Sequence, residues 1–153
     1  MQNLKIRKAK IKDIREIQNL INSFAKQDLM LPRSLNEIYD NLRDFWVFEE
    51  NKKIVGCCAL HVCWQDLAEI KSLAVTKHRQ RRGIGSQLIT TCIKEAKELG
   101  AKKIFVLTYK PEFFRKFWFK RIKYSDLPHK IWAECINCPK FPDCQEIPMV
   151  KQL

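Results

Sequence analysis

Apolar residues recur at regular spacing along most of this chain, and the spacing predicts alternating strands and helices. Residues 4–9 (LKIRKA) alternate between apolar and polar, which predicts a half-buried strand. Helical spacing follows up to about residue 26. The apolar face of that helix is expected to consist of Ile11, Ile14, Ile17, Leu20, Ile21 and Phe24. Pro32 then breaks the pattern, and Ser34 with Glu37 predicts a capping box that begins a second helix. This helix should carry Leu35, Ile38 and Leu42 inward.

The central part of the chain predicts buried strands around one long helix. Strands are expected over residues 45–49, 54–64 and from 67 onward, and the second of these is apolar on both faces and therefore central. A helix is expected from Ile84 to Leu99, with Gly100 just beyond its end. Its apolar positions are Ile84, Leu88, Ile89, Cys92, Ile93, Ala96 and Leu99. The rest of the chain predicts a strand at 104–109, a short helix opened by Pro111, and strands at 119–122 and 146–153.

The segment between the strand at residue 67 and the long helix is rich in glycine and arginine. A strand that feeds a glycine-containing loop at a helix start directs backbone N–H groups and the positive end of the helix dipole to one point. Four long polar side chains crowd the same loop: Arg79, Gln80, Arg81 and Arg82. Such a cluster repels itself unless an anion is bound. The loop therefore predicts a phosphate or pyrophosphate site.

Length, charge and cysteine content narrow the class of protein. A chain of 153 residues, 46% of them apolar, suits one domain that spans residues 1–153. The sequence contains no apolar run long enough to cross a membrane and no apolar leader, so a cytoplasmic protein is expected. The net charge of +12 fits a solvated surface, a nucleic-acid partner or a polyanionic small molecule. Charge alone does not separate these three.

The seven cysteines divide into two groups. Cys57, Cys58, Cys63 and Cys92 lie in strand or helix patterns and are expected to be small core residues. Residues 126–153 form a cysteine- and proline-rich extension that we expect to pack on the domain. There Cys135, Cys138 and Cys144, with His129, offer four ligands for a structural zinc ion. Buried thiols and a disulfide are the alternatives.

The segment Gln80-Arg81-Arg82-Gly83-Ile84-Gly85 fits the pattern Q/R-x-x-G-x-G/A. This pattern resembles the acetyl-CoA pyrophosphate loop of the GCN5-related N-acetyltransferase (GNAT) family, and the order of predicted elements is similar to that family's. The resemblance implies an α/β (α+β) GNAT fold: a mixed sheet of about six to seven strands with about four helices. Other stretches are similar to one branch of the family, the acetyltransferase domain of N-acetylglutamate synthase. They are LPRS at 31–34, DF at 44–45, VGCCALH at 55–61, AEI at 68–70 and FVLT at 105–108.

The resemblance also implies roles for individual residues. Glu69 matches a glutamate that often takes the amine proton, usually through water, and burial in an apolar strand would support that role. Arg33 matches an arginine that holds a carboxylate of glutamate; Ser72 and Lys110 are further candidates for contact with the substrate. The coenzyme is expected to contact Leu73, Ala74, Val75, Gln80, Arg81, Arg82, Gly83, Ile84, Gly85, Ser86 and Phe114. Phe114 replaces the family's usual acidic tyrosine, so Tyr109 or a water is left to protonate the thiolate.

Three functions remain open from the sequence. The first is transfer of an acetyl group from acetyl-CoA to the α-amino group of L-glutamate, the opening step of arginine biosynthesis. The second is acetylation of another amine: glutamine, another amino acid or a protein N-terminus. The third is a basic, zinc-stabilised nucleic-acid-binding module, although such a module has no need of the glycine loop. We expect a small amino-acid substrate and no membrane partner, and the sequence leaves a homodimer open.

Overall fold

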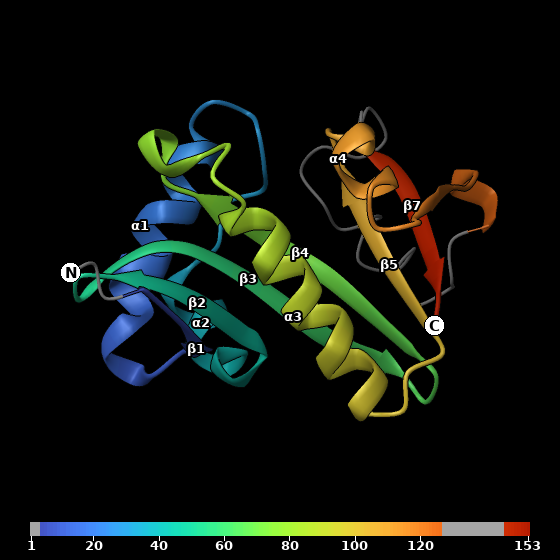
Figure 1. Ribbon diagram of the computed structural model, residues 1–153, viewed down its shortest axis with the longest axis horizontal. Coiled ribbons are helices and arrows are strands. Elements are labelled where there is room, and N and C mark those ends of the chain that lie inside the picture. Colours follow the sequence, from blue (N-terminus) through green and yellow to red (C-terminus); the bar gives the residue numbers. More distant parts are fainter. Residues whose placement is uncertain (1–3, 127–145) are drawn as a thin grey trace.

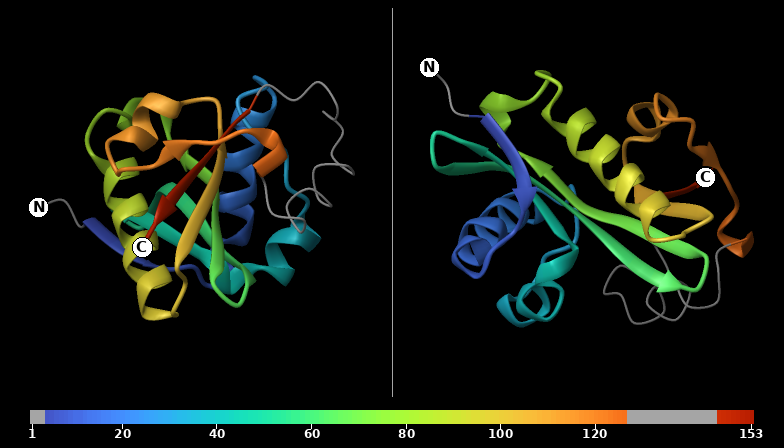
Figure 2. Two further views of the ribbon diagram at one scale, coloured as in Figure 1. Left: turned by 90° about the vertical axis from the view of Figure 1, so that its right-hand side faces the viewer. Right: turned by 60° about the horizontal axis from the view of Figure 1, so that its bottom comes forward.

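The computed structural model describes residues 4–126 and 146–153, which form a seven-stranded sheet with helices on both faces (Figures 1 and 2). The strands are β1 Leu4–Lys8, β2 Phe45–Glu50, β3 Lys53–Trp64, β4 Leu67–Val75, β5 Lys103–Thr108, β6 Lys120–Arg121 and β7 Ile147–Gln152. The helices are α1 Ile14–Ala25, α2 Leu35–Asp40, α3 Ile84–Glu98 and α4 Pro111–Arg115. Short 3₁₀ turns are η1 Ile11–Asp13, η2 Leu42–Asp44, η3 Lys77–Arg79 and η4 Tyr124–Asp126. The predicted elements are thus confirmed in kind and order.

The sheet is mixed. Its strand order is β1-β2-β3-β4-β5-β7-β6, and every neighbouring pair is antiparallel except β4 and β5. The parallel pair is joined through α3, as a parallel connection requires a crossover. The prediction that β3 is central is confirmed, since it lies third of seven strands.

Strands β4 and β5 separate part-way along their length. Their pairing ends at Ile70 and Val106, yet β4 continues to Val75 and β5 to Thr108 (Figure 1). The cause is a bulge in β4: two residue steps on β3, from Cys57 to Ala59, match three steps on β4, from Ala74 to Lys71. Ser72 has a φ of 58° in this bulge, which bends the strand away from its neighbour. The sheet therefore opens into a V.

Each face of the sheet has its own core. On one face, α3 and α4 cover a cluster that includes Leu60, Ile70, Leu88 and Ile104. On the other, α1 and α2 cover a cluster that consists of Ile14, Ile17, Ile21, Ile38, Phe45, Val47, Cys57, Ala59 and Ala74. The expected core positions of Cys57, Cys58, Cys63 and Cys92 are confirmed, since all four thiols are buried. Burial raises the pKa of the Cys57 thiol to about 12, so it stays neutral.

Two residues of the predicted apolar faces are exposed. The prediction for Ile11 is wrong: its exposed fraction is 69%, because residues 11–13 form the η1 turn and not the first turn of α1. Leu99 is 60% exposed, because α3 ends one residue earlier at Glu98. Ser34 caps α2 as predicted, with its hydroxyl accepting from the Glu37 N–H at 3.1 Å.

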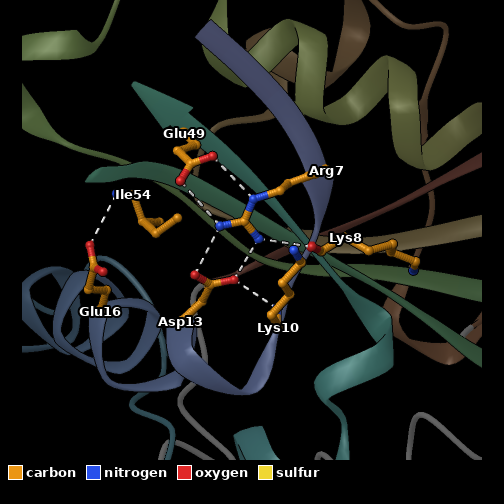
Figure 3. A network of polar contacts seen from close by, with 7 residues as sticks. All are labelled: Arg7, Lys8, Lys10, Asp13, Glu16, Glu49 and Ile54. Carbon is orange, nitrogen blue, oxygen red and sulfur yellow. Dashed lines mark hydrogen bonds and ion pairs between the residues drawn. The ribbon is translucent and has the colours of Figure 1, made fainter. Parts of the chain in front are cut away.

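A buried ion pair fixes the start of α1 on the sheet (Figure 3). Asp13 is only 2% exposed and accepts from both terminal nitrogens of Arg7, at 2.7 and 3.1 Å. Arg7 also donates to Glu49 on β2 at 3.2 Å, and the Lys10 N–H donates to Asp13 at 2.7 Å. Burial by itself would raise the pKa of Asp13, but the bonds from Arg7 and Lys10 together hold it below its usual value. The network thus joins β1, β2 and the entry into α1.

In residues 4–126 and 146–153, every helix is too short or too polar to cross a bilayer. The four expected zinc ligands, His129, Cys135, Cys138 and Cys144, lie outside the described residues, so zinc stays a prediction. The same holds for the packing of residues 127–145 on the rest of the chain.

Candidate active site

The loop before α3 has the geometry of an anion site. Gly83 precedes the helix with a φ of 82°, a left-handed conformation that glycine adopts without strain. No side chain caps the helix, and its first turn contains no acidic residue. The first N–H groups of α3, those of Ile84, Gly85 and Ser86, are thus left to point out of its positive end. A Cβ added at Gly83 would meet nothing within 4 Å, so this approach is open.

The four polar side chains of the loop divide into two pairs. Arg79 forms an ion pair with Glu50, which is buried, and the Gln80 amide donates to the Val75 carbonyl at 3.0 Å. These two side chains therefore hold the loop itself. Arg81 and Arg82 are exposed, and within the described residues neither forms an ion pair. Both cations therefore remain available to a phosphate.

Glycines also let α3 and α4 pack closely around this end of the sheet. A Cβ at Gly56 on β3 would lie 3.1 Å from the Ile84 side chain and 3.2 Å from that of Leu88, so α3 can sit directly on β3. A Cβ at Gly85 would lie 3.4 Å from the ring of Phe113 on α4. The neighbouring Phe114 is only 4% exposed and packs edge-to-face against Phe113. Its ring belongs to the core, and its predicted contact with the coenzyme stays a prediction.

The V between β4 and β5 offers backbone groups. Among the described residues, the edge of β4 that faces β5 has no strand partner beyond Ile70, and this part of β4 contains Leu73, Ala74 and Val75. A strand edge without a neighbouring strand suits a ligand arm that contains amides, although the Val75 carbonyl already accepts from Gln80. The three residues whose backbones are predicted to contact the coenzyme thus lie at the end of β4 that leads into the glycine loop, and those contacts stay predictions.

Glu69 lies where the V begins. Its Cα pairs with His61 on β3 and with Phe105 on β5, so these three residues share the face of the sheet that α1 and α2 cover. The exposed fraction of Glu69 is 6%. Ser72, in the bulge just beyond, is also buried, and its carbonyl accepts from the Cys57 thiol at 3.4 Å. Across the V, the Lys110 N–H donates to the Thr108 hydroxyl at 2.8 Å, while Lys110 itself is exposed.

Arg33 lies in the loop between α1 and α2, which rises at the open end of the V (Figure 1). Side chains of α1 hold this loop: Asn22 accepts from the Arg33 N–H at 3.1 Å, and Gln18 donates to the Arg33 carbonyl at 3.3 Å. The Arg33 guanidinium donates to Glu37 at 3.2 Å, and Glu37 is half exposed. An exposed pair of this kind is weak, so Arg33 can exchange its partner for another carboxylate.

A histidine and an aspartate beside Glu69 form a pair to which the sequence pattern assigned no role. His61 Nδ1 lies 2.6 Å from Asp44 Oδ2, and their side chains are 27% and 24% exposed. The available signal was a single imidazole in the otherwise apolar strand IVGCCALHVCW. Its partner, in η2, was not indicated by spacing.

Comparison with known proteins agrees with this geometry. Residues 11–119 match the model of the acetyltransferase (GNAT) family. This chain belongs to the GNAT family. An uncharacterised N-acetyltransferase of Chlorobaculum tepidum is 38% identical over 97% of this chain and 96% of its own length. An amino-acid acetyltransferase of Mycobacterium tuberculosis is 33% identical over 84% of this chain and 75% of its own length.

The fold is also similar to that of a solved structure with bound coenzyme A. The N-acetylglutamate synthase from Neisseria gonorrhoeae, complexed with coenzyme A and N-acetyl-glutamate, superposes with a TM-score of 0.90 at 26% identity. The match covers 99% of this chain and 35% of that one. The protein is thus an acetyl-CoA-dependent N-acetyltransferase of the GNAT type, related to amino-acid acetyltransferases. The glycine loop, the uncapped α3 and the open β4 edge are the features that fit coenzyme A.

Proposed function

We propose that this protein acetylates the α-amino group of an amino acid and that L-glutamate is the preferred acceptor. The observation that carries the proposal is that Arg33 and Glu69 belong to the same side of the sheet: Glu69 on the face under α1 and α2, Arg33 in the loop between those helices. Arg33 is suited to bind a carboxylate, and Glu69 is suited to accept a proton. The similarity to amino-acid acetyltransferases supports the same acceptor class. Glutamate would place this protein at the opening step of arginine biosynthesis in the cytoplasm.

Arg33 would select the acceptor. Its backbone is fixed by Asn22 and Gln18, so the guanidinium starts from a defined position. An incoming carboxylate replaces Glu37, which is half exposed and regains water when it leaves. Ser72 and Lys110 stay candidates for further contact with the acceptor, at the bulge and across the V.

Glu69 would act as the general base. Acetyl-CoA supplies an acetyl group activated as a thioester, and the amine must be unprotonated to attack it. Glu69 is only 6% exposed and lies where β4 and β5 separate, so a proton that it accepts is taken up within the site. A backbone N–H of Ala74 or its neighbour on β4 would donate to the thioester carbonyl oxygen as its negative charge develops.

An acceptor panel tests the proposal. Acetyl transfer to glutamate, glutamine, alanine, lysine and a peptide N-terminus is followed by release of the free thiol. We expect glutamate to have the highest kcat/KM. Arg33→Ala should raise the KM for glutamate by about tenfold to a few hundredfold without moving the KM for acetyl-CoA. Glu69→Gln should lower kcat by about 10²-fold to 10⁴-fold with little change in either KM.

Arg15→Ala is the matched control, because Arg15 is an exposed arginine on α1 and should leave all parameters unchanged. If glutamate is no better than alanine or lysine, or if Arg33→Ala leaves its KM unchanged, the assignment of glutamate is wrong. The family assignment does not depend on this result.

A further inference from the structure

His61 and Asp44 form a pair with a defined orientation. A carboxylate only accepts hydrogen bonds, so the contact of 2.6 Å from Asp44 Oδ2 places the proton of the imidazole on Nδ1. Nε2 then carries the lone pair, and the geometry of the ring turns it away from Asp44. Among the described residues no hydrogen bond to Nε2 occurs. The pair is therefore arranged to accept a proton at Nε2, with Asp44 holding the ring in this tautomer and orientation.

The pair adjoins the predicted general base. His61 and Glu69 are directly opposite in the antiparallel β3–β4 pair, so both side chains leave the same face of the sheet. Asp44 approaches from η2, on the far side of His61. Among the described residues, Lys71 is a further charged residue on this part of the face, two positions beyond Glu69 on β4. Arg33 lies in the loop before α2, and its partner Glu37 lies in α2.

The two proton acceptors differ in their access to water. The exposed fraction of Glu69 is 6%, whereas the side chains of His61 and Asp44 are 27% and 24% exposed. A proton taken by His61 can pass to solvent, while one taken by Glu69 stays inside the site. This contrast matters because acetylation of an ammonium group removes two protons from its nitrogen.

The two protons must leave the acceptor nitrogen at different stages of the reaction. The first N–H bond must break before attack, since an ammonium has no lone pair. After the N–C bond forms, the second N–H bond breaks as the C–S bond breaks, and that proton ends on the leaving thiolate. One proton is therefore released to water and one remains in the site.

We propose that the His61–Asp44 pair accepts the first proton, from the α-ammonium of the acceptor, and releases it to solvent, while Glu69 handles the second. This inference rests on the proposed function, because it requires an amino-acid acceptor whose α-amino group arrives as an ammonium ion. His61 Nε2 forms the new N–H bond, and Asp44 is a positioning residue that fixes the tautomer.

The test is the pH dependence of kcat/KM for His61→Gln and Asp44→Asn, measured with the best acceptor of the panel. At pH 7 we expect losses of about 30- to 300-fold for His61→Gln and a smaller loss for Asp44→Asn. Both losses should shrink to less than about threefold near pH 9.5, where the acceptor amine loses its proton unaided. Binding of coenzyme A, followed by calorimetry, should be unchanged in both variants, which also shows that they are folded.

Asp40→Asn is the matched control, because Asp40 is an exposed aspartate at the end of α2, close in sequence to Asp44. It should match the wild type at every pH. A loss of equal size at all pH values in both variants would mean a structural role and would overturn the proposal. So would full activity of His61→Gln at pH 7. The result does not depend on which amino acid proves best, so failure of the glutamate assignment is recognised separately by the panel.

Discussion

Replacement of Gly83 tests the anion site most directly. The structure shows a φ of 82° at this position and no atom within 4 Å of an added Cβ. Gly83→Asp therefore creates no steric clash, and it introduces a carboxylate at the mouth of α3. Gly83→Asn is the ideal control, since it has nearly the same size and the same left-handed backbone but no charge.

The two variants should lose the same amount of folding stability but differ in their affinity for coenzyme A. The left-handed conformation costs a residue other than glycine about 1 kcal/mol, and asparagine and aspartate tolerate it best. Both variants should therefore melt about 2–4 °C below the wild type. A carboxylate about 6 Å from a pyrophosphate, at an effective dielectric constant of about 40, is repelled by about 1.4 kcal/mol per phosphate charge. Two charges give about 3 kcal/mol, or a loss of about 100-fold in affinity.

Isothermal titration calorimetry with coenzyme A measures this difference. We expect Gly83→Asn to bind within about fivefold of the wild type and Gly83→Asp to bind about 100-fold more weakly than Gly83→Asn. The gap should narrow at high salt, because salt screens the repulsion at an exposed loop. Equal affinities of the two folded variants at low salt would refute the placement of the pyrophosphate at α3.

Two further predictions concern stability and metal content. Asp13→Asn leaves Arg7 buried without its main partner, so it should lower the free energy of unfolding in urea by about 2–4 kcal/mol. Glu112→Gln is the control, because Glu112 forms an exposed pair with Arg115, and it should lower this free energy by less than about 1 kcal/mol. The pKa of Asp13 is lowered in the folded state, so its contribution to the free energy of unfolding is complete above its ordinary pKa of about 3.9 and is lost as the pH falls below that value. Urea unfolding measured from pH 6 to pH 2 should show that loss in the wild type and not in Asp13→Asn. Protein purified without chelator should contain about one zinc per chain, and Cys138→Ser should lose it; metal analysis that finds none would retire the zinc site.

Local patterns in the sequence determined the elements and the coenzyme loop. The spacing of apolar residues from Ile84 onward can be buried only as one helical face, so α3 was predictable within one residue of each end. Gly83 stands where a left-handed turn is needed at the start of that helix, so the loop could be recognised from a short motif. The alternation in residues 4–9 likewise predicted β1. These features depend on residues close together in the chain, and the sequence displays them directly.

Only the tertiary structure decided which polar side chains meet. The pairs Arg79–Glu50 and His61–Asp44 join residues 29 and 17 positions apart, and they form because strand order and register bring those positions together. Arg79 was counted in the basic cluster that predicts an anion site, but it forms an ion pair with a buried carboxylate on β2. The bulge at Ser72 is a further example, since no local signal requires a φ of 58° at a serine. The packed sheet imposes that conformation, and the V in which the coenzyme is expected to bind follows from it.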